Sequence, residues 1–221
     1  MAFHFSGVWS RRQWWLVAAA WVVSGGLAWA EAVESWKEVS NADGLKVYER
    51  SHPGSNLREY RGTGLVEVPP ATIKRVLGDV ENFPSFMPYV KEAKLISEAP
   101  QARVTYQRIS PPVVGDRDYT VATKIEERKF SEGPGYTIRW ATANQLGPAE
   151  KAGVTRVKTT EGSWILEPTK GGQSTLVTYT VYTDSGGSIP VWMLNTAGKS
   201  AVPKIFAAVR KQVRLAKYQQ P

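Results

Sequence analysis

The sequence predicts an α+β fold in which a curved antiparallel β-sheet wraps around a long C-terminal α-helix. Between residues 94 and 182, apolar and polar residues alternate in short runs separated by Pro and Gly, which is typical of an antiparallel meander. Two segments, one before this run and one at the end of the chain, have apolar residues at helical spacing instead. Because two helices have to cover one face of about seven or eight strands, we expect the sheet to curve strongly around the last helix.

The first two strands precede the meander. Residues 45–49 follow a turn signal and alternate apolar with polar residues. Residues 57–68 alternate in the same way, and Gly62 and Gly64 within them indicate a bulge or a bend. We therefore expect a short regular strand followed by a longer distorted one.

The next segment changes to helical spacing. Its apolar residues recur at intervals of three and four, at Ile73, Val76, Leu77 and Val80. This pattern predicts a helix that begins just after Pro70 and ends near Asn82, because proline is favoured in the first helical turn. Residues 83–88 contain two further prolines and are expected to form a short turn.

The meander and the terminal helix complete the chain. Six strands are expected, at residues 94–98, 103–109, 118–126, 136–141, 155–167 and 175–182. The terminal helix has an apolar stripe formed by Val202, Ile205, Phe206, Val209 and Val213. Its other faces carry Lys204, Arg210, Lys211, Arg214 and Lys217.

The composition limits the chemistry that the chain can perform. Of 221 residues, 42% are hydrophobic and 22% charged, as in an ordinary folded domain, and the mean hydropathy of -0.31 excludes a polytopic membrane protein. The chain has no Cys, which excludes thiol chemistry and Cys-based metal sites. Its two histidines, His4 and His52, cannot form a metal-binding cluster, and His52 is expected in an exposed loop. No catalytic residue, metal or cofactor is therefore predicted.

The N-terminal segment resembles an export signal. Arg11 and Arg12 precede the uncharged apolar run 14–27, and Ala30 ends an A-x-A cleavage site. We expect residues 1–30 to be a signal peptide, residues 31–221 to form one domain, and the mature protein to be periplasmic or secreted. Since both arginines leave with the signal, the formal net charge of +8 falls to +6. An uncleaved membrane anchor and export by the twin-arginine route remain alternatives.

Three segments resemble a known family in order and spacing. They are residues 73–84 of the first helix, residues 110–119 with Arg117, Asp118 and an aromatic residue, and residues 187–195 with a Gly-x-Ile-Pro-x-Trp motif. Together they resemble the START lipid-transfer domains over about residues 36 to 218, as a bacterial exported member. The first helix alone is shared with the wider polyketide-cyclase-like superfamily. The resemblance implies a helix-grip fold with an internal hydrophobic cavity for one lipid.

The resemblance and the strand pattern together nominate residues for the cavity and its lid. The ligand-binding candidates are Tyr106, Arg108, Arg117, Tyr119, Trp140, Tyr179, Trp192, Val202, Phe206 and Val209. In steroid-carrying members of the family, an arginine six residues after the motif arginine helps to form a charged pair in the cavity. This chain has Thr123 there, so the resemblance does not extend to a cholesterol-type polar contact.

Several of these candidates have a structural interpretation as well. Arg117 could face the ligand, or it could anchor its turn through an ion pair or a backbone hydrogen bond. Tyr106 and Arg108 share one face of a strand, with Ile109 and its neighbours on the other, and either face could look inward. The tryptophans and tyrosines of the strands could fill the core or line the ligand.

Two classes of function fit the sequence. The first is a non-enzymatic carrier, a monomer that takes a phospholipid, sterol, fatty acid or pigment from a membrane, with the terminal helix and residues 111–115 parting as the ligand passes. The second is a cyclase- or hydrolase-like enzyme with Asp118 or Glu59 as general acid or base. Without a nucleophile elbow, acyl transfer is not expected. The basic terminal helix fits a solvated face or a transient membrane contact, and we expect no nucleic acid partner.

Overall fold

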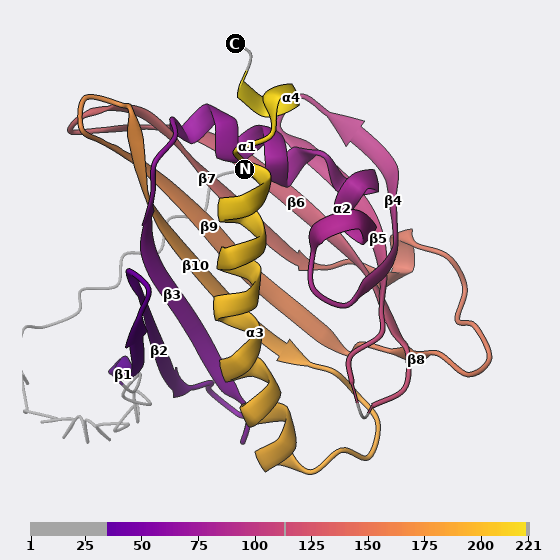
Figure 1. The fold of residues 1–221 in the computed structure, drawn as a ribbon. Helices are drawn as coiled ribbons and strands as arrows, with labels where there is room; N and C mark the ends of the chain where they lie inside the picture. The colour runs from indigo at the N-terminus through magenta and orange to yellow at the C-terminus, as the bar shows by residue number, and fades with distance from the viewer. Residues whose placement is uncertain (1–34, 113, 220–221) are drawn as a thin grey trace, which may run out of the picture. The chain divides into compact units, whose positions relative to one another are not determined.

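The computed structural model describes residues 35–112 and 114–219, so the predicted export signal lies outside the described residues. Within the described part, one large sheet faces a group of helices (Figure 1). No helix among these residues is long and apolar enough to cross a membrane.

The sheet has ten strands, and its main path follows the order β1-β2-β3-β10-β9-β7-β6-β5-β4 with every neighbouring pair antiparallel. The short β8 lies off this path and pairs in parallel with β6. The strands are β1 (Lys37–Ala42), β2 (Leu45–Ser51), β3 (Arg58–Val66), β4 (Val90–Ala99), β5 (Ala102–Ile109), β6 (Arg117–Phe130), β7 (Gly133–Thr142), β8 (Thr155–Arg156), β9 (Thr159–Thr169) and β10 (Ser174–Asp184).

Four α-helices and two 3-10 turns accompany the sheet among the described residues, and the four α-helices lie on one side of it. These elements are α1 (Pro70–Gly78), the 3-10 turn η1 (Val80–Asn82), α2 (Phe83–Phe86), the 3-10 turn η2 (Asn144–Leu146), α3 (Val191–Gln212) and α4 (Ala216–Gln219). In Figure 1, α3 runs across the face of β3, β10 and β9, while α1 packs against β7 and β9 and α2 packs against β4. The predicted helix-grip arrangement, a curved antiparallel sheet around a long C-terminal helix, is thereby confirmed.

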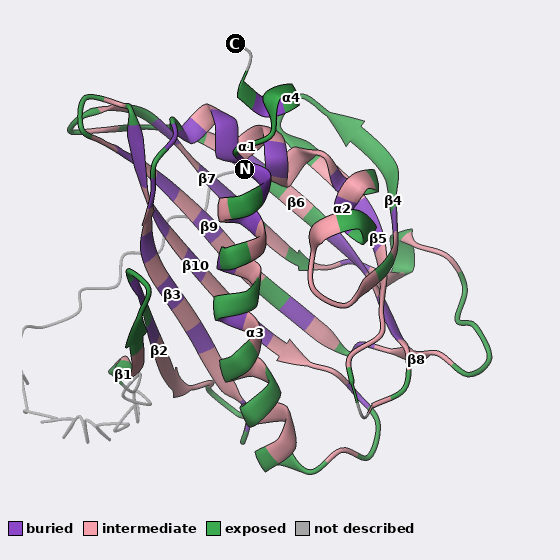
Figure 2. Cartoon of the chain, in the orientation of Figure 1, coloured by how far each residue is buried: buried purple, intermediate pink, exposed green. Residues whose placement is uncertain are grey.

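The apolar stripe of α3 packs against the sheet. Val202, Phe206 and Val209 are at most 2% exposed, whereas the opposite side of the helix faces solvent (Figure 2). Gly62 of β3 makes this close approach possible, because a Cβ there would lie 2.6 Å from Val202 Cγ1 and 2.7 Å from Phe206 Cε2. Because Gly62 has no side chain, Val202 and Phe206 of α3 can pack directly against the backbone of β3.

This contact corrects the interpretation of Gly62 and Gly64 as a bulge. β3 pairs with β2 and with β10 without any shift in register. The glycines instead leave room for neighbours, since a Cβ at Gly64 would lie 2.8 Å from the carbonyl oxygen of Gly44. Register shifts occur only between β1 and β2 and between β4 and β5, among the strand pairs described.

Other local expectations also need correction. Most of the turn expected at residues 83–88 is the short helix α2, and the helix predicted to end near Asn82 stops at Gly78. The strand expected at residues 155–167 is divided into β8 and β9. β1 has no strong alternation and was not predicted.

His52 is not the freely exposed loop residue that its neighbours suggested. Its ring stacks on Tyr182 with 3.5 Å between ring centroids, and the residue is half-buried. The loop after β2 therefore holds the His52 ring against Tyr182 of β10.

Candidate functional site

The main cavity lies between the inner face of the sheet and the helices, with a volume of about 350 Å³. Strands β5, β6, β7, β9 and β10 provide its floor, α3 one wall, and α1 and the segment around α2 another. Because side chains alternate across a strand, every second residue of each floor strand points into this space. The inward residues of the curved sheet therefore form the site, in the space that α3 leaves open on the inner face.

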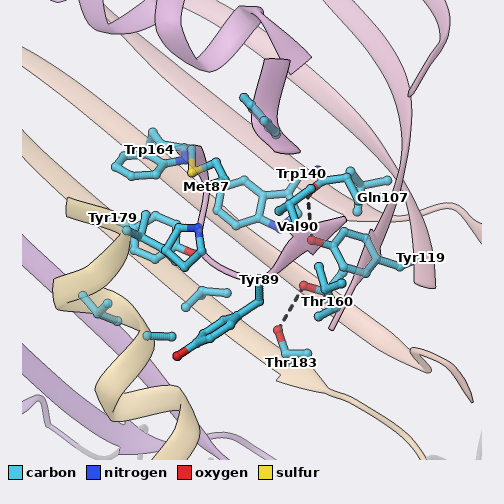
Figure 3. Close-up of a pocket in the computed structure, with 18 of the residues that line it drawn as sticks. Met87, Tyr89, Val90, Gln107, Tyr119, Trp140, Thr160, Trp164, Tyr179 and Thr183 are labelled. Atoms are coloured by element: carbon cyan, nitrogen blue, oxygen red, sulfur yellow. Dashed lines mark hydrogen bonds between the residues drawn. The ribbon is translucent and has the colours of Figure 1, made fainter. Parts of the chain in front are cut away.

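Aromatic rings form the centre of the floor. Trp164 and Tyr179 have ring centroids 4.3 Å apart, and Trp140 and Tyr179 are stacked at 5.8 Å (Figure 3). Gly162, opposite Trp140 on β9, accommodates the indole, because a Cβ at Gly162 would lie 2.4 Å from Trp140 Cζ2. Three large rings thus present a broad apolar surface, as expected of a site for an apolar ligand.

Polar groups are few and are paired with one another. Tyr119 donates a hydrogen bond of 3.1 Å to Gln107 Oε1 on the neighbouring strand, and the hydroxyls of Thr160 and Thr183 lie 3.0 Å apart (Figure 3). Burial raises the pKa of Tyr119 to about 12, and burial also raises the pKa of Tyr179. Both phenols are therefore neutral at any physiological pH and offer hydrogen bonds rather than charge.

The charges at the cavity are all positive. Among the described residues, Arg58, Lys74 and Arg103 line it, and no Asp or Glu does. Lys74 and Arg103 lie together, since they also line a second pocket beside Gly78 and Tyr136. Arg58 lies near the start of α3, where its backbone N–H donates to Asn195 Oδ1.

A short segment between α2 and β4 borders the cavity opposite α3. Met87, Pro88, Tyr89 and Val90 all line it. Tyr89 has a φ of 65°, a left-handed conformation that costs a non-glycine residue energy. Its hydroxyl accepts a hydrogen bond from Lys204 Nζ of α3, and Figure 3 shows the ring beside this helix. The segment and the helix are thus joined by an exposed contact at the side of the cavity.

The structure brings four of the ten predicted site residues into the cavity lining. They are Tyr119, Trp140, Tyr179 and Val202. Phe206 and Val209 are buried in the core between α3 and the sheet, outside the lining. Trp192, at the start of α3, is 67% exposed and also lies outside it.

For β5, the prediction named residues on the face that points away from the cavity. Thr105, Gln107 and Ile109 line the cavity, so Tyr106 and Arg108 point to the other side of the sheet. There, the two guanidinium nitrogens Nε and Nη2 of Arg108 lie 2.9 and 2.5 Å from Asp116 Oδ2. The sequence left both faces open, because each carries apolar and polar residues.

The motif residues Arg117 and Asp118 also lie outside the cavity lining. Asp118 accepts hydrogen bonds from Arg156 Nε at 2.7 Å and from Tyr106 at 3.1 Å. Arg117 donates to the backbone oxygen of Gly115 at 2.5 Å. In the described structure, these residues anchor the start of β6, which was the structural alternative for Arg117.

Sequence reasoning missed Arg103, the charged residue that the structure places at one end of the cavity. Arg103 pairs in register with Thr123 of β6, which pairs in turn with Trp140 of β7. These three residues form a row across the cavity floor. The alternation that places Thr105 inward also places Arg103 inward, so the signal was present once the inner face was known.

The chain is similar in sequence to proteins of several organisms. A model of the family described as "Polyketide cyclase / dehydrase and lipid transport" matches residues 66–210. An uncharacterized protein of Pseudomonas aeruginosa is 34% identical over 77% of this chain and 83% of its own length. The phosphatidylcholine transfer protein of Mus musculus is 28% identical over 77% of this chain and 80% of its own.

Solved structures show the same fold. A STAR-related lipid transfer protein fragment from Xanthomonas axonopodis has a TM-score of 0.73 and 28% identity, covering 81% of this chain and 99% of that one. Human StAR-related lipid transfer protein 5 has a TM-score of 0.66 and 19% identity, covering 81% of this chain and 86% of that one.

Proposed function

Because the chain belongs to the START domains within the polyketide cyclase, dehydrase and lipid transport family, we propose that it binds one lipid or other hydrophobic molecule in the cavity and carries it between membranes. The observation that carries this proposal is the space itself, with its floor of Trp140, Trp164 and Tyr179 and its helical wall. Well-packed domains do not leave such a volume empty, whereas a ligand can fill it.

The names of the relatives support the same class of ligand. Phosphatidylcholine transfer proteins from several mammals are similar to most of the chain, and the Xanthomonas axonopodis structure is named for lipid transfer. We extend this to the present chain at the level of an apolar molecule with a polar end. Which lipid it takes depends on the side chains of this particular cavity.

The two acids proposed for the enzymatic alternative, Asp118 and Glu59, lie outside the cavity lining. Asp118 is bonded to Arg156 and Tyr106, and Glu59 accepts a 2.6 Å hydrogen bond from Arg50. Neither residue lines the cavity, so neither can reach a ligand held there. This arrangement supports a non-enzymatic carrier over a cyclase or a hydrolase.

The carrier function can be tested with a cavity-filling variant. Ala201 lines the cavity from α3, whereas Ala207 on the same helix is exposed. We expect native mass spectrometry to show the wild type with one lipid per chain after incubation with mixed vesicles, and Ala201→Phe with far less. Ala207→Phe is the control for the added ring and should bind as the wild type does. A folded wild type that takes up no lipid would contradict the proposal.

We also propose that α3 and residues 87–90 form the gate. The bond between Lys204 and Tyr89 joins them, and no other described polar contact links this segment to α3. Lys204→Met should therefore speed the exchange of bound lipid with vesicles, and Lys199→Met, at an exposed site of the same helix, should not. Equal rates in both variants would place the entrance elsewhere, for example at the expected loop 111–115, of which Pro111 lines the cavity.

The site of action is proposed from the sequence. Export with removal of residues 1–30 would deliver the carrier to the periplasm or the exterior, and exposed Val191, Trp192 and Leu215 together with the basic face of α3 would suit a transient membrane contact. N-terminal sequencing of the secreted protein tests cleavage. Replacing Arg11 and Arg12 by Lys distinguishes the twin-arginine route, which needs both arginines, from general secretion.

A further inference from the structure

The charge of the cavity narrows the class of lipid. Its three charged lining residues, Arg58, Lys74 and Arg103, are all cationic, and none of the described lining residues is a carboxylate. A cavity of this kind raises the energy of a bound cation and lowers that of a bound anion.

Arg103 is the residue best placed to meet an anion. Its side chain is only 13% exposed. One guanidinium nitrogen, Nη1, donates to the backbone oxygen of Gly78 at 2.9 Å, and Nη2 lies 3.4 Å from Glu98 Oε1, a side chain that is 53% exposed. Nε is buried and has no hydrogen-bond partner among the described residues. A buried donor of a charged group is costly when it is left unpaired, so the described residues satisfy the Arg103 guanidinium only in part, at the edge of a cavity that this residue lines.

The surroundings of Arg103 suit the boundary between an acid group and an apolar chain. Lys74 also lines both the cavity and the second pocket beside it, and adds a second positive charge. Thr123, directly opposite Arg103 on β6, offers a hydroxyl. Beyond them the floor becomes apolar through Ile125 and Ile138 and reaches Trp140 through the cross-strand row.

We propose that the ligand of this cavity is an anionic lipid, whose carboxylate or phosphate lies against Arg103 and Lys74 and whose chain extends over the aromatic floor. This inference rests on the proposed carrier function and specifies its ligand. The guanidinium presents parallel N–H donors that match the two oxygens of a carboxylate or phosphate. A zwitterionic headgroup would place its phosphate there as well, but its ammonium would find no carboxylate in the lining.

Competition within a single vesicle tests the proposal. The protein is incubated with vesicles that contain equal parts of phosphatidylcholine and phosphatidylglycerol with a smaller fraction of oleic acid, and the bound lipid is identified by native mass spectrometry. Because all three lipids share one membrane, attraction of the basic protein to the vesicle affects them equally. We expect bound phosphatidylglycerol or oleic acid to exceed phosphatidylcholine by about tenfold relative to the vesicle composition, as one charge-assisted hydrogen bond supplies. The mass distinguishes a phospholipid phosphate from a fatty acid carboxylate.

Two variants connect the selectivity to Arg103. Arg103→Gln should reduce the preference for the anionic lipids by about tenfold while lipid is still bound, and Arg103→Lys should retain part of it. Arg139→Gln is the matched control, because Arg139 lies on the exposed side of β7 and is 53% exposed. Its selectivity should equal that of the wild type.

Each outcome has a separate meaning. If the folded wild type takes up none of the three lipids, the carrier function itself fails. If it takes up phosphatidylcholine as readily as the anionic lipids, the carrier function stands and the inference of an anionic ligand is wrong. If the preference survives in a folded Arg103→Gln variant, Arg103 is not the anion-binding residue. The wild-type competition decides the ligand class even if a variant does not fold.

Discussion

Two arginines of this molecule are equally buried but have opposite surroundings. The side chain of Arg156 is 14% exposed and that of Arg103 is 13% exposed. Arg156 lies outside the cavity, and its Nε is 2.7 Å from Asp118 Oδ1 while Nη2 is 3.0 Å from the backbone oxygen of Pro148. Arg103 lies at the cavity, and its Nε has no partner among the described residues. Burial alone therefore does not separate the two arginines, whereas a buried carboxylate partner and a position outside the cavity lining distinguish Arg156 from Arg103.

The paired cluster holds its charges in place. The Arg156 pKa is raised because Asp118 accepts its hydrogen bonds, and burial together with the charge of Asp118 raises the pKa of Tyr106 to about 12. Arg156 and Tyr106 therefore keep their protons at any physiological pH, and Asp118 joins β5, β6 and β8. This cluster therefore joins three strands through a buried ion pair, whereas the carboxylate that pairs with Arg103 is largely exposed.

The largest expected effect follows from breaking the ion pair between Asp118 and Arg156. Asp118→Asn removes the charge that pairs with buried Arg156, and we expect the free energy of unfolding to fall by about 3–5 kcal/mol. Urea denaturation measures it. Glu98→Gln is the matched change beside Arg103 and should cost less than about 1 kcal/mol, because that carboxylate is largely exposed. Similar losses in the two variants would remove the distinction between the arginines.

A smaller effect is expected at the third member of the cluster. Tyr106→Phe deletes the hydroxyl that donates to Asp118 at 3.1 Å, while the buried ring keeps its packing. A hydrogen bond to a charged group contributes about 1.5–3 kcal/mol, and we expect the stability to fall by that amount. Lipid selectivity should not change, since Tyr106 points away from the cavity. A change in selectivity without a loss of stability would contradict this placement.

Arg103 should show the reverse behaviour. Arg103→Met removes a buried charge with an unpaired donor and keeps an unbranched side chain, so the unfolding free energy should change by less than about 1 kcal/mol or increase. Arg156→Met, the same substitution in the paired cluster, leaves Asp118 without its partner and should be clearly destabilising. Thermal unfolding of the two lipid-free variants compares them directly. A strongly destabilised Arg103→Met would identify Arg103 as a structural residue.

The smallest effect concerns acid stability on the outer side of β5. Hydrogen bonds from Ser110 and Arg108 lower the pKa of Asp116 from 3.8 to about 2. A carboxylate with a depressed folded-state pKa stabilises the fold above its ordinary pKa, and this contribution disappears as the pH falls from about 4 to about 2. Asp116→Asn should therefore flatten the loss of stability between pH 4 and pH 2 in denaturant titrations. An unchanged slope would mean that other carboxylates dominate.

The sequence predicted the elements with strong periodicity. The stripe of α3 and five of the six meander strands match closely, because both helical spacing and strict alternation are set by local geometry. β1 and the division between β8 and β9 could not be predicted in this way. β1 is defined as a strand by its hairpin pairing with β2, and β8 by its parallel pairing with β6, which is distant in the sequence.

The candidate site was predicted less well than the fold. Alternation shows that two faces of β5 differ, but only the curvature of the whole sheet decides which face is inside. Tyr106 and Arg108 were therefore chosen where Thr105 and Gln107 line the cavity, and Arg103 was overlooked. Trp192 has a large apolar side chain of the kind that is usually buried, yet its position in the first turn of α3 leaves it exposed.

The sheet is open, so its two outer strands, β1 and β4, each leave one row of backbone groups without a partner strand in the order found here. Such rows invite pairing with a second copy, and aggregation follows when nothing opposes it. The three register shifts that the described strand pairs contain all fall at these two edges, at Glu38/Ser40, Val90/Glu92 and Leu95/Ser97. The irregular backbone and the charged side chains of β4 give an approaching strand no continuous ladder to join. Edges of this kind disfavour strand-to-strand pairing between two copies of the chain.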